Sequence, residues 1–144
     1  MTAWADPSPP ALDVALLDRL RAASGFVRID GLPGDPRAVA AAVDALAAFG
    51  FDLERVDGAV AYRGPSPRLC PDQIEHELGT LRVGRRVAVW SRVESTNDLA
   101  ARGASTEAND GLAVLAEEQT AGRGRRGRSF VAPAGSSLLT SVLL

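Results

Sequence analysis

Three prolines in the eight residues "GPSPRLCP", at positions 64–71, interrupt the chain near its middle. Proline fixes its own φ and lacks an amide N–H, so neither a helix nor a central strand can run through such a stretch. The elements on its two sides must therefore form separately. The sequence predicts two parts, residues 1–64 and residues 81–144, joined by a linker over residues 65–80.

The first part combines two helical patterns with one hairpin pattern. "ALDVALLDRLRAAS", from residue 11, places four leucines on one stripe, which is the spacing of an amphipathic helix. "GDPRAVAAAVDALAAFGF" predicts a second helix with Asp35 as its N-cap, Pro36 at its first position and Gly50 at its left-handed end. Asp57-Gly58 then predicts a hairpin between two short strands. The buried side of the second helix should consist of Val39, Val43, Leu46 and Phe49.

The second part alternates strand and helix patterns. "RRVAVWSRV" predicts a strand, "STNDLAARGA" a short helix capped by Ser95, and "LAVLAEE" a mostly buried strand. "SSLLTSVLL" predicts a further strand that runs to Leu144. An unpaired apolar strand at that position leaves a core half covered, so we expect a truncated domain. The fold class expected for the chain is α/β (α+β).

Composition excludes several classes of protein. The net charge is −2 and the pI about 5.4, so no overall basic field attracts nucleic acid or lipid. Residues 1–10, "MTAWADPSPP", do not have the pattern of a secretory signal, and no stretch approaches the ~18 apolar residues of a membrane span. The single Cys70 excludes an internal disulfide and favours a cytoplasmic protein.

A run of arginine and glycine carries the strongest chemical signal. In "AGRGRRGRSF", residues 121–130, arginine fills four of the six positions from Arg123 to Arg128. Three interpretations stay open: a solvated charge cluster, a nucleic-acid contact with only Phe130 to stack on bases, or a site for a phosphate or carboxylate. The run lacks the GK[ST] ending of a Walker loop.

A second polar cluster, Ser95-Thr96-Asn97, lies where a predicted strand meets a predicted helix. It is either an ordinary helix cap or a set of hydrogen-bonding groups for a polar ligand. Gln119, at the end of the next strand, strengthens the second reading. His76 has no partner at metal-ligand spacing, and the neighbouring Glu117 and Glu118 should face opposite sides of a strand, so no metal site is predicted.

Taken together, "STN", "AEEQTAGRGRRGRSF", Pro133 and Gly135 resemble the bacterial biotin protein ligases over about residues 86–144. Residues 11–64 are weakly similar to the winged-helix domain that precedes the catalytic domain in repressor-type members. The resemblance implies a degenerate winged-helix-like domain in residues 1–64. It implies a truncated, mixed-sheet catalytic domain of the biotin/lipoate-ligase type in residues 81–144.

The resemblance also implies an ATP-dependent reaction. Biotin and ATP, with Mg²⁺, would give biotinyl-5′-AMP and pyrophosphate, and a lysine of a biotin carboxyl carrier protein would then take the biotin. A cytoplasmic enzyme is expected, and a homodimer stays open. Two rivals stay open, a biotin-responsive transcriptional regulator and a non-catalytic anion-binding module.

Family motifs assign roles to individual positions. Arg125 matches the catalytic arginine. Biotin binding is implied for Ser95, Thr96, Asn97, Gln119, Arg123, Gly124 and Arg125. Contact with ATP or the adenylate is implied for Gly122, Arg125, Arg128 and Phe130, the last at a position where many members have tryptophan.

Two departures from the family pattern matter. The 144 residues contain no lysine, whereas the family uses one in a later stretch, so this chain alone should not form biotinyl-adenylate at an appreciable rate. The helix that would read DNA, "PRAVAAAVDALAAFG", offers only Arg37 and Asp44 as long or charged side chains. Alanine reaches neither base edges nor phosphates, so specific DNA binding is not expected.

Overall fold

The computed structural model describes residues 11–144, and the predicted absence of a signal in residues 1–10 lies outside this part. The described residues divide into two compact units, with the boundary in the sequence after Arg68. The C-terminal unit therefore begins at Leu69. Its first helix, α3 (Pro71–Glu75), comes from the segment predicted as a linker.

The N-terminal unit begins with α1 (Val14–Ala22), as the leucine stripe predicts. The Asp13 side chain accepts a hydrogen bond from the Leu16 N–H at 2.8 Å, which satisfies one of the amides left without a partner in the first turn. Leu17 and Leu20 are almost fully buried and form the centre of the core.

The second helix, α2 (Pro36–Phe49), confirms the prediction at both ends. Asp35 accepts from the Ala38 N–H at 3.1 Å, and Gly50 ends the helix with φ 117°, a conformation that a residue with a Cβ rarely adopts. Its buried face is the predicted one, Val39, Val43, Leu46 and Phe49.

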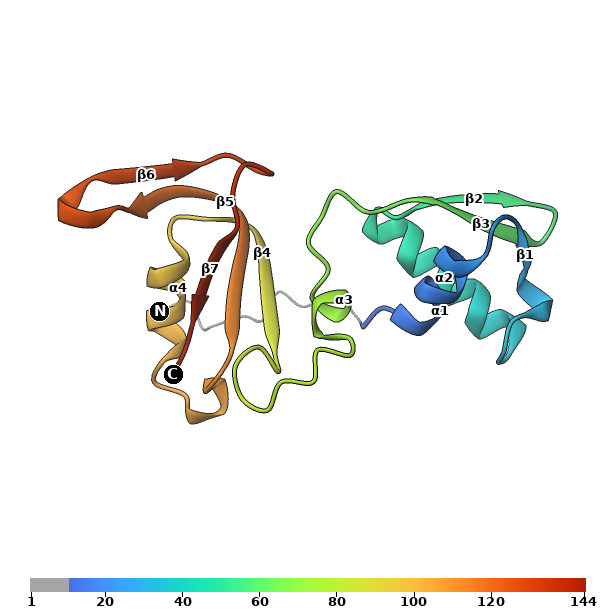
Figure 1. Cartoon of the computed structure of the whole chain (residues 1–144), viewed down its shortest axis with the longest axis horizontal. Coiled ribbons are helices and arrows are strands. Elements are labelled where there is room, and N and C mark those ends of the chain that lie inside the picture. Colours follow the sequence, from blue (N-terminus) through green and yellow to red (C-terminus); the bar gives the residue numbers. More distant parts are fainter. Residues whose placement is uncertain (1–10) are drawn as a thin grey trace. The chain divides into compact units, whose positions relative to one another are not determined.

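Three short strands complete this unit (Figure 1). They are β1 (Val27–Arg28), β2 (Asp52–Val56) and β3 (Ala59–Gly64), in the order β1-β3-β2 and all antiparallel. A short 3-10 helix, η1 (Ile29–Gly31), follows β1. The hairpin turn is the predicted Asp57-Gly58, with φ positive at both residues. The likeness of this unit to a winged helix stays a prediction.

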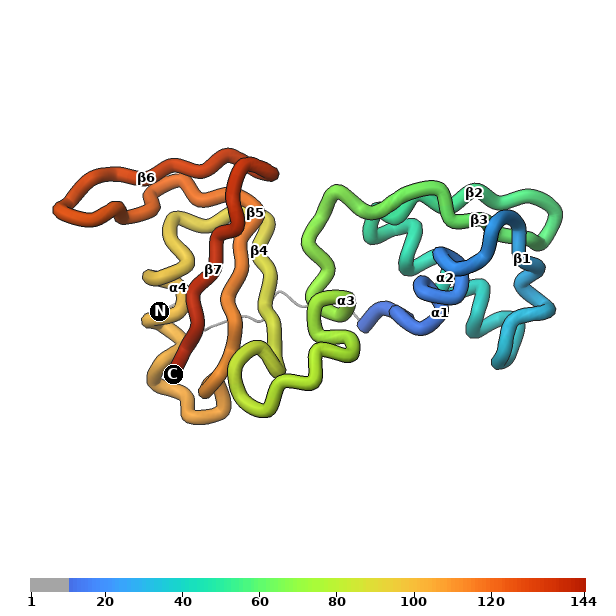
Figure 2. The backbone as a smooth tube through the Cα atoms, viewed as in Figure 1, coloured from blue at the N-terminus to red at the C-terminus, as the bar shows by residue number. Residues whose placement is uncertain are grey.

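The C-terminal unit is built on one long strand. β5 (Ala113–Arg123) lies parallel to β4 (Val87–Val93), and the two are joined through α4 (Thr96–Gly103), a path that can be followed in Figure 2. The register runs from Val87 opposite Ala113 to Val93 opposite Gln119. This β-α-β unit brings the carboxyl ends of β4 and β5 to the same edge of the sheet.

The other edge of β5 is shared by two strands. β7 (Leu139–Val142) pairs antiparallel with residues 113–116, and β6 (Ser129–Ala132) pairs antiparallel with residues 119–123. The result is a mixed, four-stranded sheet, in agreement with the α/β prediction. The strand β6 was not predicted, because the arginine-rich stretch before it reads as a loop.

Apolar side chains cover both faces of this sheet. Alternate residues point to opposite faces, so Ala88 and Val114 pack beneath α4, whereas Val87 and Leu115 pack beneath Leu69 and Ile74. The Val87 N–H also donates to the Glu75 carboxylate of α3. A 3-10 helix, η2 (Glu107–Asn109), leads from α4 into β5. Between residues 11 and 144, no helix has the length and apolar character to cross a membrane.

Candidate functional site

The predicted polar cluster lies where β4 ends and α4 begins. In sheets with parallel strands, ligands bind beyond the carboxyl ends of the strands, and this junction lies at such an end. Ser95 is the N-cap of α4, but its hydroxyl makes no capping hydrogen bond, although the residue is only 3% exposed. The hydroxyl forms no hydrogen bond with any residue in the described range. No fully buried polar side-chain atom of that range lacks a partner, so this oxygen is open to the neighbouring cleft and can bind a ligand.

Gln119 takes the place of the missing cap. Its Oε1 accepts from the backbone N–H of Thr96 at 2.9 Å and lies 3.3 Å from the Thr96 hydroxyl. Both residues are buried. The sequence predicted that Gln119 and Ser95-Thr96-Asn97 act together, and the structure brings them into direct contact.

Gly122 makes room for this glutamine. A Cβ at Gly122 would lie 2.0 Å from Nε2 of Gln119 and 2.6 Å from the Phe130 carbonyl oxygen. The register of β5 against β6 shifts between Gln119 and Gly122, as at a β-bulge. Only glycine fits at this position. Gly122 therefore contacts the polar cluster by packing directly against the Gln119 side chain.

Sequence reasoning missed Ser141 of β7. Its Oγ lies 2.9 Å from the Thr96 hydroxyl and 2.6 Å from Oδ1 of Asn97. One signal was present, since Ser141 is a polar residue inside the apolar run "SSLLTSVLL". That signal says nothing of the partner, because only the fold brings β7 against α4.

Arg123 also reaches this junction. Strand β5 extends to Arg123, beyond the predicted end of the strand, and the guanidinium donates to Asp98 of α4 at 3.0 Å. The arginine side chain is 74% exposed and the aspartate 34% exposed. An exposed ion pair of this kind is weak, so an incoming anion can compete for Arg123. The role of Asp98 was not predicted.

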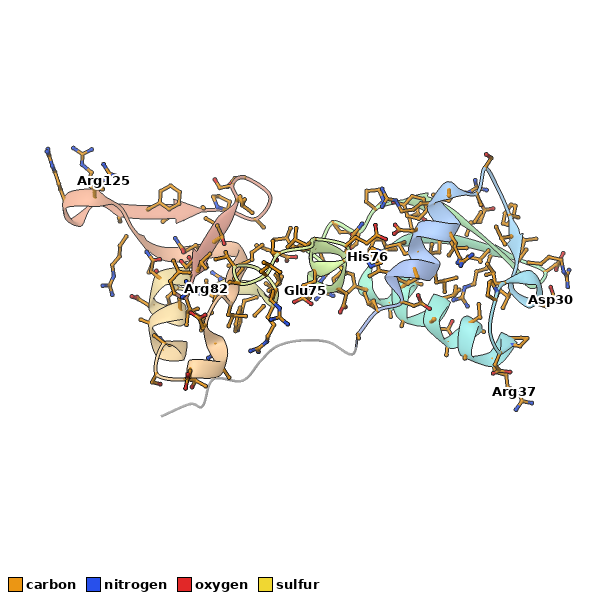
Figure 3. The ribbon with its side chains drawn as sticks, turned by 60° about the horizontal axis from the view of Figure 1, so that its bottom comes forward. Asp30, Arg37, Glu75, His76, Arg82 and Arg125 are labelled. Atoms are coloured by element: carbon orange, nitrogen blue, oxygen red, sulfur yellow. The ribbon has the colours of Figure 1, made fainter. Side chains whose placement is uncertain are left out.

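The rest of the arginine run forms the turn between β5 and β6. The Gly124 N–H donates to the Arg128 carbonyl at 2.7 Å and closes the turn around a 3-10 segment, η3 (Arg125–Gly127). Arg126 has a positive φ of 60°. Figure 3 shows Arg125 pointing away from the ribbon, and Arg128 and Phe130 are also exposed. These residues do not reach the polar cluster in this structure.

Two clefts flank the start of α4. Ser95 and Asp98 line one of about 340 Å³, together with Trp90 and Leu99. Asn97 and Ser141 line the other, of about 700 Å³. Thr96 and Gln119 line neither cleft. The polar cluster is therefore divided: Ser95 lies at one cleft, Asn97 at the other, and Thr96 and Gln119 form a buried contact.

An ion pair lines part of the larger cleft. Arg82 donates through Nε and Nη2 to both oxygens of Asp110, at 2.8 and 2.7 Å. These hydrogen bonds, with the charge of Arg82, lower the pKa of the Asp110 carboxyl below its usual value. The same contacts raise the pKa of Arg82. The pair joins the segment before β4 to the turn before β5.

The carboxylates of β5 have structural partners. Glu117 accepts from the Leu69 N–H at 2.8 Å, and Glu118 pairs with Arg92 at 3.5 Å. His76 lies 3.9 Å from Glu77. Over residues 11–144, no three or more histidine, cysteine, aspartate or glutamate side chains gather as a metal site would require.

Comparison with known proteins gives two matches. Residues 89–144 match the family model described as "Biotin/lipoate A/B protein ligase family". The chain is also 42% identical over 81 residues to "Biotin--[acetyl-CoA-carboxylase] ligase" of Mycobacterium tuberculosis (strain ATCC 25618 / H37Rv). That alignment covers 52% of this chain and 30% of the relative, so the chain spans about a third of the length of the relative it matches.

Proposed function

We propose that this chain provides the biotin-binding part of a biotin protein ligase, since residues 89–144 match the model of the biotin/lipoate A/B protein ligase family. The complete reaction would join biotin to ATP as biotinyl-5′-AMP and then transfer biotin to a lysine of a carrier protein. The name of the mycobacterial relative gives acetyl-CoA carboxylase as its target. A biotin carboxyl carrier protein is therefore the acceptor that we propose.

The observation that carries this proposal is the contact between Gln119 and the start of α4. It assembles amide and hydroxyl groups at the carboxyl ends of two parallel strands, which suits a neutral, polar head group such as the ureido ring of biotin. Ser95, whose hydroxyl has no partner among the described residues, and Asn97 flank Thr96, each from its own cleft.

The arginines suit the other end of the substrate. In the first step a carboxylate oxygen of biotin bonds to the α-phosphorus of ATP, and the bond from that phosphorus to the bridging oxygen of pyrophosphate breaks. Both reactants are anions, so approach requires positive donors. Arg123, beside the head-group cluster, is placed to bind the biotin carboxylate, with Gly124 giving its backbone close access.

Arg125 is proposed as the catalytic arginine that stabilises the phosphate during the transfer. Arg128, Phe130 and Gly122 would contact the adenylate, with Phe130 stacking on adenine. Because Arg125, Arg128 and Phe130 are exposed on the β5–β6 hairpin, this proposal requires the hairpin to close over the ligand. The gain would be the exclusion of water from the mixed anhydride.

Mg²⁺ would accompany the phosphates of ATP, but no residue is assigned to it. The described residues gather no cluster of acidic or histidine side chains that would hold the ion. In the second step a carrier lysine attacks the carbonyl carbon of the anhydride, forms an amide and releases AMP.

Calorimetric titration of the chain with biotin tests the proposal. We expect saturable binding that Arg123→Ala weakens about 10- to 150-fold, since a charge-assisted hydrogen bond contributes about 1.5–3 kcal/mol. Arg37→Ala is the matched control, because Arg37 is an exposed arginine of α2, in the other unit, and lines neither of the two clefts. Its affinity for biotin should be that of the wild type.

Two results would contradict the proposal. One is the absence of measurable binding of biotin by the folded chain. The other is tighter binding of lipoic acid than of biotin, which would assign the chain to the lipoate branch of the same family.

A further inference from the structure

We propose that Ser141 is a positioning residue of the ligand site. Its hydroxyl holds the carboxamide of Asn97 so that the NH₂ group of Asn97 is turned toward the ligand. The inference rests on the proposed function for the identity of the ligand. It adds a residue to the site and assigns Asn97 the part of a hydrogen-bond donor.

The fold places Ser141 against α4. In β7, Ser141 pairs with Val114 of β5, and its side chain shares a face with Leu143 two residues on. Leu143 packs with Ala100 of α4 in the core, so the Ser141 hydroxyl meets the first turn of the same helix. Its Oγ lies within hydrogen-bond distance of both Thr96 and Asn97.

Counting protons fixes the direction of the shorter contact. Oδ1 of Asn97 has lone pairs and no proton, so it can only accept. The single hydroxyl proton of Ser141 is therefore donated to Oδ1 across 2.6 Å. The longer contact, 2.9 Å to the Thr96 hydroxyl, ties the same oxygen to the residue that Gln119 holds.

This arrangement decides what Asn97 offers to a ligand. With Oδ1 engaged, the two N–H bonds of Nδ2 are the remaining polar groups, and they donate to no residue within the described part of the chain. Asn97 is exposed and lines the larger cleft. Its ligand partner must therefore be an acceptor, such as the carbonyl oxygen of a cyclic urea.

Without Ser141 the carboxamide loses this restraint. Asn97 is an exposed side chain, and rotation about χ1 and χ2 would then present either the oxygen or the nitrogen to a ligand. Loss of one neutral hydrogen bond, or of the order that it imposes, weakens binding roughly 2- to 13-fold. The hydroxyl, and not the bulk of the side chain, should be responsible.

The experiment uses the whole 144-residue chain and its variants Ser141→Ala, Ser141→Thr and Thr140→Ala. Thr140 is the matched control, an exposed hydroxyl residue on the opposite face of β7. Three-bond NMR couplings to Cγ of Asn97 report its χ1 rotamer in the ligand-free protein. Titration with biotin then gives the affinity of each variant.

We expect a single Asn97 rotamer in the wild type, in Ser141→Thr and in Thr140→Ala, and rotamer averaging in Ser141→Ala. Affinity for biotin should fall roughly 2- to 13-fold in Ser141→Ala alone. If Ser141→Ala does not fold, Ser141→Cys replaces it, because a thiol keeps the volume and is a poor donor.

A single Asn97 rotamer in the variant without the hydroxyl would overturn the inference, as would unchanged affinity for biotin. A wild-type chain that does not bind biotin would instead contradict the proposed function. The couplings are measured without ligand, so they decide the role of Ser141 in that event too.

Discussion

Thr96 and Gln119 are joined by a hydrogen bond from a backbone N–H to a side-chain oxygen, 2.9 Å long, across 23 residues of sequence. The start of α4 is therefore capped by the neighbouring strand and not by its own N-cap side chain. Helix and strand are fixed relative to each other, and the polar groups at the junction are ordered before any ligand arrives. Such preorganisation lowers the entropic cost of binding.

Gly122→Ala should disrupt this contact. The new Cβ would meet Nε2 of Gln119 and the Phe130 carbonyl at distances that no real Cβ adopts, so Gln119 or the β5–β6 pairing must move. Overpacking of this kind costs about 1–3 kcal/mol. Urea unfolding should show that loss, and the affinity for biotin should fall with it.

Gly25→Ala is the matched control for that substitution. A Cβ at Gly25 has nothing within 4 Å, and the residue does not require a positive φ. Its unfolding free energy should stay within about 0.5 kcal/mol of the wild type. Equal effects of the two substitutions would show that the fit at Gly122 is not what restricts the position to glycine.

Arg125→Ala should weaken binding of a non-hydrolysable biotinyl-adenylate analogue far more than Arg126→Ala. Of these two residues, Arg125 matches a ligand-contacting position of the family motif and Arg126 does not, although both side chains are exposed on the same turn. We expect the affinity for the analogue to fall about 10- to 150-fold in Arg125→Ala and about 2-fold or less in Arg126→Ala. Calorimetric titration of both variants gives the comparison.

Equal losses for the two arginines would mean that the turn acts as diffuse charge, and the assignments of Arg125 and Arg128 would be wrong. Limited proteolysis with and without the analogue adds a second measure. Four arginines within six residues repel one another, so the turn should be cleaved faster without the ligand than with it.

The Arg82–Asp110 pair predicts a stability that depends on pH. The folded-state pKa of Asp110 is depressed, so the pair stabilises the fold above the pKa of the unfolded carboxyl, about 3.9. The contribution is lost as the pH falls through the lower, folded-state pKa. At pH 7 the Tm of Asp110→Asn should be below that of the wild type, and the difference should vanish on acidification.

Glu107→Gln is the control for the pH measurement. Glu107 is an exposed carboxylate near Asp110 that forms no ion pair with residues of the described range. The Tm of this variant should follow that of the wild type between pH 7 and pH 3. A constant difference in Tm between Asp110→Asn and the wild type would contradict the proposed coupling.

The N-terminal unit should not bind specific duplex DNA. Helix α2 presents mostly alanine, Asp44 is paired with Arg55 at 2.6 Å, and Figure 3 shows Arg37 at the start of the helix, extending from it. Few phosphate contacts are available from such a face. A mobility shift that survives about 150 mM salt and competitor DNA would refute this expectation.

Local signals predicted α1, α2 and the β2–β3 hairpin, because the ends of these elements are set by neighbouring residues. Strand β1, which pairs with the distant β3, and the short η1 were not predicted. Asp35, Gly50 and Asp57-Gly58 each act through contacts or backbone angles within a few positions. Strand β6 and the extension of β5 to Arg123 could not be predicted in this way. They form only because β5 and β6 pair with each other across the arginine turn.

The candidate site was also predicted in part. Gln119 and the residues of "STN" were singled out from their positions at strand ends, and the parallel register of β4 and β5 brings them together. Ser141 and Asp98 were missed because their partners lie 45 and 25 residues away. Pairing over such distances depends on the topology and leaves no local pattern.

The most direct test of the central claim is a titration of the ¹⁵N-labelled chain with biotin, followed through backbone amide NMR signals. The Thr96 amide, which donates to Gln119, should shift most, together with those of Asn97 and Arg123. Amides of α1 and α2, in the other unit, should not move. A titration that leaves Thr96 unperturbed, or that shifts the two units alike, would contradict the assignment of the biotin site to the start of α4.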